Sequence, residues 1–119
     1  MSIARRCRGA LVAAAALCAG QAWAAEPFVG RWAVDPQACV QEGDTSETMP
    51  LIIGRGTIVW FVARCSYRSA AQRGDGWHIN ARCSAEGEVA RIRIVARRHS
   101  NWLTVRWGDS KPIKMRRCR

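Results

Sequence analysis

The sequence has few of the residues on which metal sites and acid–base catalysis depend. It contains only two histidines, His78 and His99, and neither is placed by local spacing to act with a nucleophile. It has no Cys-x-x-Cys pair and no His-x-x-x-His spacing, which disfavours zinc. The segment Gly54-Arg55-Gly56 lacks the following helix that a nucleotide-binding loop requires. We therefore expect a non-enzymatic protein without a metal ion, a nucleotide or any other cofactor.

Long apolar runs are also missing, except for one near the N-terminus. Three arginines precede an apolar run over residues 10–19, and residues 22–24 match the A-x-A cleavage pattern. The run is shorter than the roughly 20 apolar residues that span a bilayer. We predict a Sec-type signal peptide over residues 1–24, cleavage at its end, and a periplasmic or secreted domain over residues 25–119. A retained membrane anchor and a lipoprotein signal at Cys18 are the alternatives.

Cysteine is the residue type that most constrains the predicted mature domain. Four cysteines remain there, Cys39, Cys65, Cys83 and Cys118, and an even number in a short exported chain predicts two disulfides. A hairpin centred on Gly74 would place Cys65 directly across from Cys83. We therefore predict Cys65–Cys83 and, by elimination, Cys39–Cys118, each of which would stabilise the fold by about 3–5 kcal/mol.

Short alternating segments typical of β-strands fill the rest of the domain, without an internal repeat or a convincing amphipathic helix. The clearest runs over residues 76–84, with Trp77, Ile79, Ala81 and Cys83 on one face. Similar segments, separated by turn signals, cover residues 28–34, 50–53, 57–68, 88–96, 101–107 and 112–117. The pattern predicts an all-β antiparallel meander of about eight strands, closed into a small barrel. A β-sandwich is the alternative.

Several motifs of the domain resemble those of known small barrels. Gly30-Arg31-Trp32 is similar to the G-x-W opening of lipocalin-like barrels. Small exported bacterial β-barrel proteins of unassigned function show a similar overall pattern: Asp35-Pro36-x-x-Cys39, then Cys65, Trp77 and Cys83, then Arg117-Cys118. The resemblance implies a closed or nearly closed lipocalin-like barrel and brings no activity with it. Small secreted barrels that inhibit bacterial metalloproteases share the G-x-W, so a protease inhibitor is one alternative function.

Five tryptophans lie in the predicted mature domain. The strand pattern places Trp32, Trp77 and Trp107 on the core face, and Trp60 and Trp102 on the opposite face. We expect Trp77 to be among the most buried residues, so that Trp77→Ala would cost about 3–5 kcal/mol of stability. Trp60 and Trp102 would either bind a partner or cover an end of the barrel.

Basic residues are concentrated in the second half of the domain. Residues 25–63 carry two arginines and five acidic residues, which give a net charge of −3. Residues 64–119 carry fourteen Lys and Arg and four acidic residues, which give a net charge of +10. Such a balance bears on the choice of partner rather than on the fold.

Strand register decides which of these charges lie together. A turn over residues 84–87 places Arg91 across from Asn80, and a loop over residues 97–100 places Arg91 across from Arg106. Like charges that face each other on neighbouring strands are destabilising. A bound anion would relieve that repulsion, which favours a binding role for these strands.

The last turn completes a basic outer wall. A turn around Asp109 places Lys114 across from Thr104 and Arg116 across from Trp102. The predicted polyanion-binding residues of this wall are Arg82, Arg91, Arg93, Trp102, Arg106, Lys114 and Arg116. Their guanidinium groups suit bidentate contacts with phosphate, sulfate or carboxylate. We predict a monomeric module whose partner is an anionic macromolecule (a glycan, a nucleic acid or an acidic protein) or a membrane surface with its lipid headgroups. A carrier for a small apolar ligand in the barrel mouth and a merely solvated wall are the alternatives.

Overall fold

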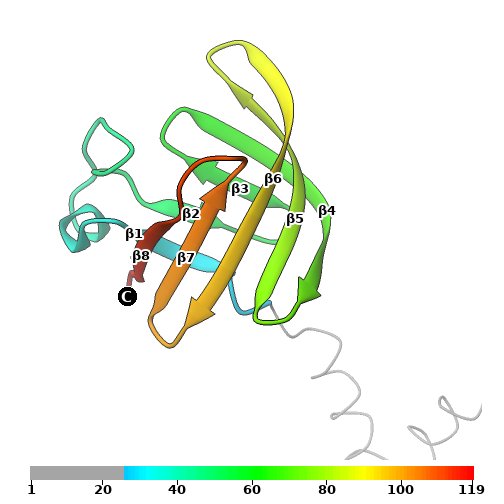
Figure 1. The fold of residues 1–119 in the computed structure, drawn as a ribbon. Helices are drawn as coiled ribbons and strands as arrows, with labels where there is room; N and C mark the ends of the chain where they lie inside the picture. The colour runs from blue at the N-terminus through cyan, green and yellow to red at the C-terminus, as the bar shows by residue number, and fades with distance from the viewer. Residues whose placement is uncertain (1–25) are drawn as a thin grey trace, which may run out of the picture.

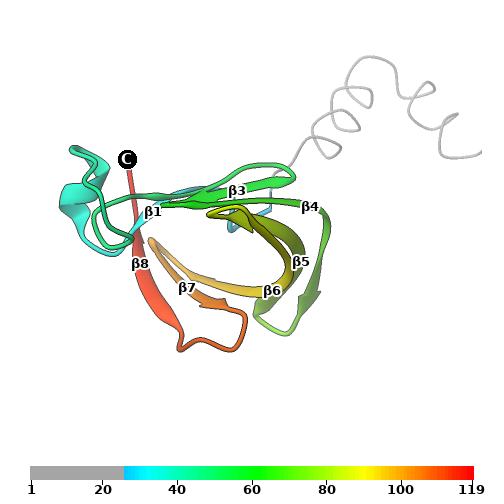
Figure 2. The ribbon, with the colours of Figure 1, turned by 90° about the horizontal axis from the view of Figure 1, so that it is seen from above.

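The computed structural model describes residues 26–119, so the predicted signal peptide and its cleavage site lie outside the described residues. Eight antiparallel strands form a closed barrel in which each strand pairs with its neighbours in sequence and β1 pairs with β8 (Figures 1 and 2). The strands are β1 (Gly30–Ala33), β2 (Leu51–Ile53), β3 (Thr57–Trp60), β4 (Ala63–Arg73), β5 (Gly76–Ala85), β6 (Glu88–His99), β7 (Trp102–Trp107) and β8 (Ile113–Arg117). A 3-10 turn, η1 (Pro36–Cys39), follows β1 and is capped by the Asp35 side chain. The predicted all-β barrel is confirmed, and the sandwich alternative is not.

Large side chains fill the interior of the barrel. The largest fully buried ones are Trp32, Phe28, Leu51, Ile53, Ile58, Ile79, Ile94, Leu103, Met115 and Val105. Phe28, just before β1, packs inside the barrel with its ring centroid 5.4 Å from that of Trp77. The Phe28 carbonyl accepts a hydrogen bond of 2.9 Å from the buried indole Nε1 of Trp32. The segment before the first strand is thus part of the core.

The prediction that Trp77 is among the most buried residues is wrong. Trp77 faces the core as expected, yet its side chain is only half-buried at the edge of the packed interior. Trp32 is completely buried, Trp107 is half-buried against the core, and Trp102 lies on the outer face with 38% of its surface exposed. Truncation of Trp77 should therefore cost less stability than truncation of Trp32.

A hairpin turn at Phe61 and Val62 divides what the sequence pattern predicted as one strand over residues 57–68. β3 ends at Trp60 and β4 begins at Ala63, and these two residues pair directly. Trp60 was predicted to face outward, but it packs against the core and its indole donates a hydrogen bond of 2.9 Å to the Ser46 carbonyl. Tight hairpin turns usually contain Gly or Asn. This one contains neither, so the sequence carries no turn signal there.

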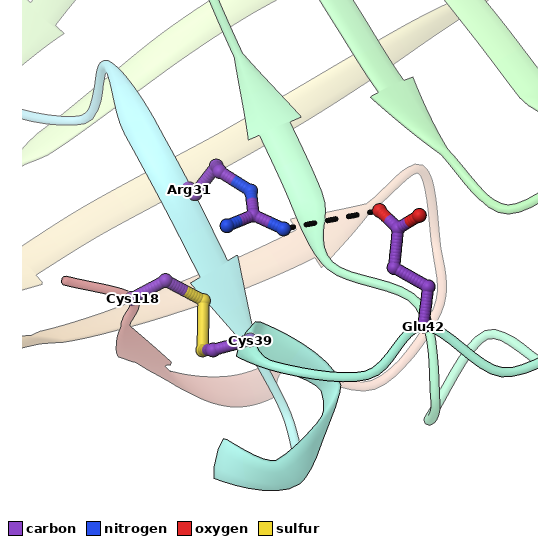
Figure 3. Close-up of polar contacts among 4 residues, drawn as sticks. All are labelled: Arg31, Cys39, Glu42 and Cys118. Atoms are coloured by element: carbon purple, nitrogen blue, oxygen red, sulfur yellow. Dashed lines mark ion pairs between the residues drawn. A yellow bond between two sulfur atoms is a disulfide. The ribbon is translucent and has the colours of Figure 1, made fainter.

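Both predicted disulfides are present, Cys39–Cys118 and Cys65–Cys83. Cys39–Cys118 joins the end of η1 to the residue that follows β8, close to an ion pair of 3.8 Å between Arg31 and Glu42 (Figure 3). This bridge ties the beginning of the domain to its end. Structural disulfides persist in oxidising compartments and are rare in the cytosol. The two bridges therefore indicate an extracellular or periplasmic protein.

A β-bulge over Arg68 and Ser69 sets the register of the other disulfide. Next to the β4–β5 turn the two strands pair in a register that, if continued, would set Cys65 across from Ser84. The bulge adds one residue to β4, and beyond it Cys65 lies across from Cys83 with the two Cα atoms 4.0 Å apart. The predicted pairing of the cysteines is correct, although the predicted hairpin had no bulge.

Strands β5 and β6 extend beyond the closed part of the barrel. β6 pairs with β7 only from Ile94 onward, and a hydrogen bond of 2.8 Å from the Gly108 amide to the Arg93 carbonyl ends that ladder. Residues 88–92 of β6 pair with β5 alone. Figure 1 shows the resulting hairpin rising above β7. The outer face of this extension carries most of the site described next.

Candidate anion-binding groove

The register of β5 and β6 differs from the predicted one by two residues. Arg91 lies across from Arg82 instead of Asn80. The chain reverses within Glu86 and Gly87 alone, both of which have positive φ angles, 52° and 84°. Such angles belong to the tight two-residue turns that match the twist of a hairpin. The prediction was wrong because it assumed a longer turn.

The register of β6 and β7 differs from the predicted one by four residues. Arg106 lies across from Val95, and was predicted to lie across from Arg91. β6 continues to His99, and the loop shrinks to Ser100 and the next residue. By contrast, the β7–β8 register is as predicted, with Thr104 across from Lys114 and Trp102 across from Arg116. The continuous basic wall is therefore not formed.

Most residues of the predicted wall fall into two separate clusters, and the first of these also contains Arg68, which was not predicted. The first, the arginine groove, consists of Arg68, Arg82, Arg91 and Arg93 on β4, β5 and β6. The second, the Trp102 cluster, consists of Trp102, Lys114 and Arg116 on β7 and β8. Trp102 pairs with His99, six positions along β6 from Arg93, a distance of roughly 20 Å along the strand. Arg106 belongs to neither cluster.

In the Trp102 cluster the cations are already engaged by the aromatic ring. Lys114 Nζ lies 4.4 Å from the centroid of the Trp102 ring, and Arg116 Cζ lies 5.6 Å from it. A cation at such a distance is attracted by the ring, by about 0.5–1 kcal/mol at an exposed site. The sequence predicted these neighbours correctly, but their charges have a partner within the protein.

The arginine groove is a hollow of about 890 Å³ on the outer face of β4, β5 and β6. Its lining residues are Ser66, Tyr67, Arg68, Ser69, Asn80, Ala81, Arg82, Arg91, Ile92 and Arg93, and none of them is acidic. Arg82 lies directly between Ser66 and Arg91 on the neighbouring strands. A smaller hollow of about 310 Å³ shares Ser66 and Arg82 with the groove. The lining combines four cations with hydroxyl and amide groups, the set of donors that oxyanions prefer.

The four guanidinium groups of the groove have no ion-pair partner among residues 26–119. The ion pairs of that part of the chain involve Asp75 and Glu42, which do not line the groove. Like charges set directly across a strand pair cost about 0.2–1 kcal/mol, so the facing pair of Arg82 and Arg91 is destabilising by itself. A bound anion would convert this repulsion into charge-assisted hydrogen bonds.

Tyr67 is a core residue at the back of the groove, and its hydroxyl is already engaged. Its hydroxyl donates a hydrogen bond of 2.6 Å to the Gly54 carbonyl. Burial raises the pKa of the Tyr67 hydroxyl above its usual value of 10.0. The Tyr67 side chain is therefore an uncharged part of the core beneath the groove.

Sequence reasoning missed Arg68 as a member of the site. The bulge places Arg68 and Ser69 together opposite Asn80, so that both line the groove. β-Bulges often redirect side chains at functional sites in this way. One signal was available: a two-residue turn at Gly74 and Asp75 cannot bring the two cysteines face to face unless β4 contains an extra residue.

Comparisons of the chain with protein-family models, curated proteins and solved structures gave no match. Within residues 26–119, no group of three or more His, Cys, Asp and Glu side chains could hold a metal ion. No helix in that part of the chain is long and apolar enough to cross a membrane.

Proposed function

We propose that the domain is an exported, non-enzymatic binding module whose arginine groove holds an anionic group of a larger partner. One observation carries this proposal: Arg82 and Arg91 face each other, without a carboxylate partner, in a hollow of about 890 Å³. Four arginines that converge on one hollow can each offer a planar fork of donors to phosphate, sulfate or carboxylate. The predicted signal peptide and the two disulfides support the placement outside the cytosol.

The Trp102 cluster is the weaker candidate for the same role. Lys114 and Arg116 lie over the ring of Trp102, so an incoming anion would compete with interactions that already exist. The carrier for an apolar ligand is weaker still, because Trp32 and Phe28 are completely buried within the barrel. Of these three candidates, the arginine groove is the one that combines an open hollow with several cations that have no ion-pair partner within residues 26–119.

The experiment compares two charge reversals that change the net charge equally. Arg82→Glu with Arg91→Glu alters the groove, and Lys114→Glu with Arg116→Glu alters the Trp102 cluster. We expect the first variant to bind heparin about tenfold more weakly or worse, because charge-assisted hydrogen bonds are lost. The second variant should lose less than about threefold in heparin affinity, because only the long-range electrostatic attraction is reduced. Thermal melts show whether both variants are folded. Equal losses would mean that binding follows net charge and that the groove has no special role.

A further inference from the structure

The turn between β3 and β4 presents two apolar side chains to solvent. Phe61 is 42% exposed and Val62 is 44% exposed. Phe61 also has a φ angle of 52°, in the left-handed region that few residues other than Gly, Asn and Asp adopt. A polar residue of that kind would suit both the backbone and the solvent better. Strain retained in an exposed apolar turn is the type of feature that marks a functional segment.

A row of paired residues crosses the outer face just below this turn. It consists of Ile52, Val59, Arg64, Ser84 and Val89, each directly across from the next on β2 to β6. Three of the five are apolar, and Ile52 and Val89 are exposed. The next outward-facing row contains Arg82 and Arg91. The outer face therefore changes from apolar at the turn, through a mixed row, to cationic in the groove.

This order of side chains matches the change of polarity across a bilayer surface, from the apolar interior to the charged headgroups. We propose that the anionic partner is a lipid bilayer with negatively charged headgroups, and that Phe61 and Val62 insert into it while the arginine groove binds a headgroup phosphate. The inference rests on the proposed function and names the partner. Surface-bound proteins commonly bury apolar side chains about 5–10 Å into the interface and place cations at the headgroups.

The spacing along β4 fits this arrangement. Arg64 of the mixed row follows Val62 by two positions, or roughly 7 Å at the rise of a strand, which is the depth of a headgroup layer. Ser66, directly across from Arg82 of the groove, follows Val62 by four positions, or roughly 13 Å, so the groove lies at the outer side of that layer. The turns β3–β4 and β5–β6 lie at the same end of the barrel, so the β5–β6 turn also approaches the bilayer (Figure 1). The exposed acids Glu86 and Glu88 lie at that second turn, where they would weaken contact with anionic lipid.

The test uses the mature protein, heparin as a soluble polyanion, and phosphatidylcholine vesicles with and without phosphatidylglycerol. The tip variant is Phe61→Asn with Val62→Ser, because Asn tolerates the left-handed backbone and the turn stays intact. The control is Val40→Ser, which removes an apolar side chain that is 79% exposed but lies after η1, outside the row. We expect the tip variant to bind the anionic vesicles about tenfold more weakly, since it loses the apolar burial. It should bind heparin like the wild type, and Val40→Ser should match the wild type in both assays. Glu86→Gln with Glu88→Gln should strengthen vesicle binding.

The outcomes separate this inference from the proposed function. If the wild type binds heparin but no anionic vesicle, or if the tip variant binds vesicles as tightly as the wild type, the bilayer is not the partner. Loss of heparin and vesicle binding together in a folded tip variant also overturns the inference, because the turn would then belong to the anion site. If the wild type binds neither probe, the proposed function falls as well.

Discussion

The arginine groove and the Trp102 cluster both present cations on the outer face of the barrel and differ in how these charges are balanced. In the groove, Arg82 and Arg91 face each other across two strands without a carboxylate partner. In the Trp102 cluster, Lys114 lies 4.4 Å from the centroid of an aromatic ring that attracts it. The first arrangement is destabilising until an anion binds, whereas the second is stable alone. The number of cations in a region therefore does not identify a binding site. Cations that lack a partner within the protein do identify one.

The two disulfides lie in different parts of the molecule relative to these two regions. Cys65–Cys83 joins β4 to β5 within the extension that carries the groove, next to Arg82, whereas Cys39–Cys118 joins the end of η1 to the residue after β8. In Figure 1, η1 and the C-terminus are on the side of the molecule away from β4 and β5. The two bridges can thus be removed separately to alter one region and not the other.

Removal of the disulfides should give the largest effects. Cys65→Ala with Cys83→Ala opens a loop with a sequence separation of 18 and should lower the free energy of unfolding by about 3 kcal/mol. Cys39→Ala with Cys118→Ala opens a separation of 79 and should lower it by about 4–5 kcal/mol. Urea unfolding measures both losses. We expect heparin affinity to fall only in the first variant, measured where both are folded, because its bridge holds the register of the groove. If the second variant lost more affinity, the groove would not depend on this register.

Neutralising one cation in each region should give smaller effects of opposite sign. Arg91→Gln removes the repulsion with Arg82 and should raise the free energy of unfolding by about 0.5 kcal/mol. Lys114→Gln removes a cation from the Trp102 ring and should lower it by about 0.5 kcal/mol. Urea unfolding at low salt makes the comparison, and added salt should reduce the gain in Arg91→Gln. Two changes of the same sign would mean that the charges of the two regions are not balanced differently.

Much of the fold could be predicted from short-range patterns. The alternation of apolar and polar residues predicted the face on which most side chains lie, and the spacing of the cysteines predicted both disulfides. The wrong β5–β6 and β6–β7 registers differed by two and by four residues. Since a strand repeats every two residues, such even shifts keep each side chain on its correct face and change only its neighbours. Arg91 was therefore correctly predicted to face outward and was assigned the wrong partners.

The remaining features depend on backbone conformations for which the sequence carries no local motif. Phe61 and Glu86 have positive φ angles in tight turns, at positions where turn rules look for Gly or Asn. The bulge that adds Arg68 to the groove is set by the disulfide and the turn together, not by a local motif. The conformations of these two turns and the bulge are determined by strand pairing in the folded barrel. The candidate site was therefore predicted in part, through Arg82, Arg91 and Arg93, and its boundaries required the structure.

The most direct test of the difference between the two regions is an NMR titration of the isotopically labelled mature domain with inositol hexakisphosphate, a small soluble polyanion. We expect the earliest and largest amide shifts at Arg68, Ser69, Arg82 and Arg91, with saturation at a single site. Amides of Trp102, Lys114 and Arg116 should move later and less. Shifts centred on Trp102, or spread evenly over every basic residue, would contradict the assignment of anion binding to the arginine groove.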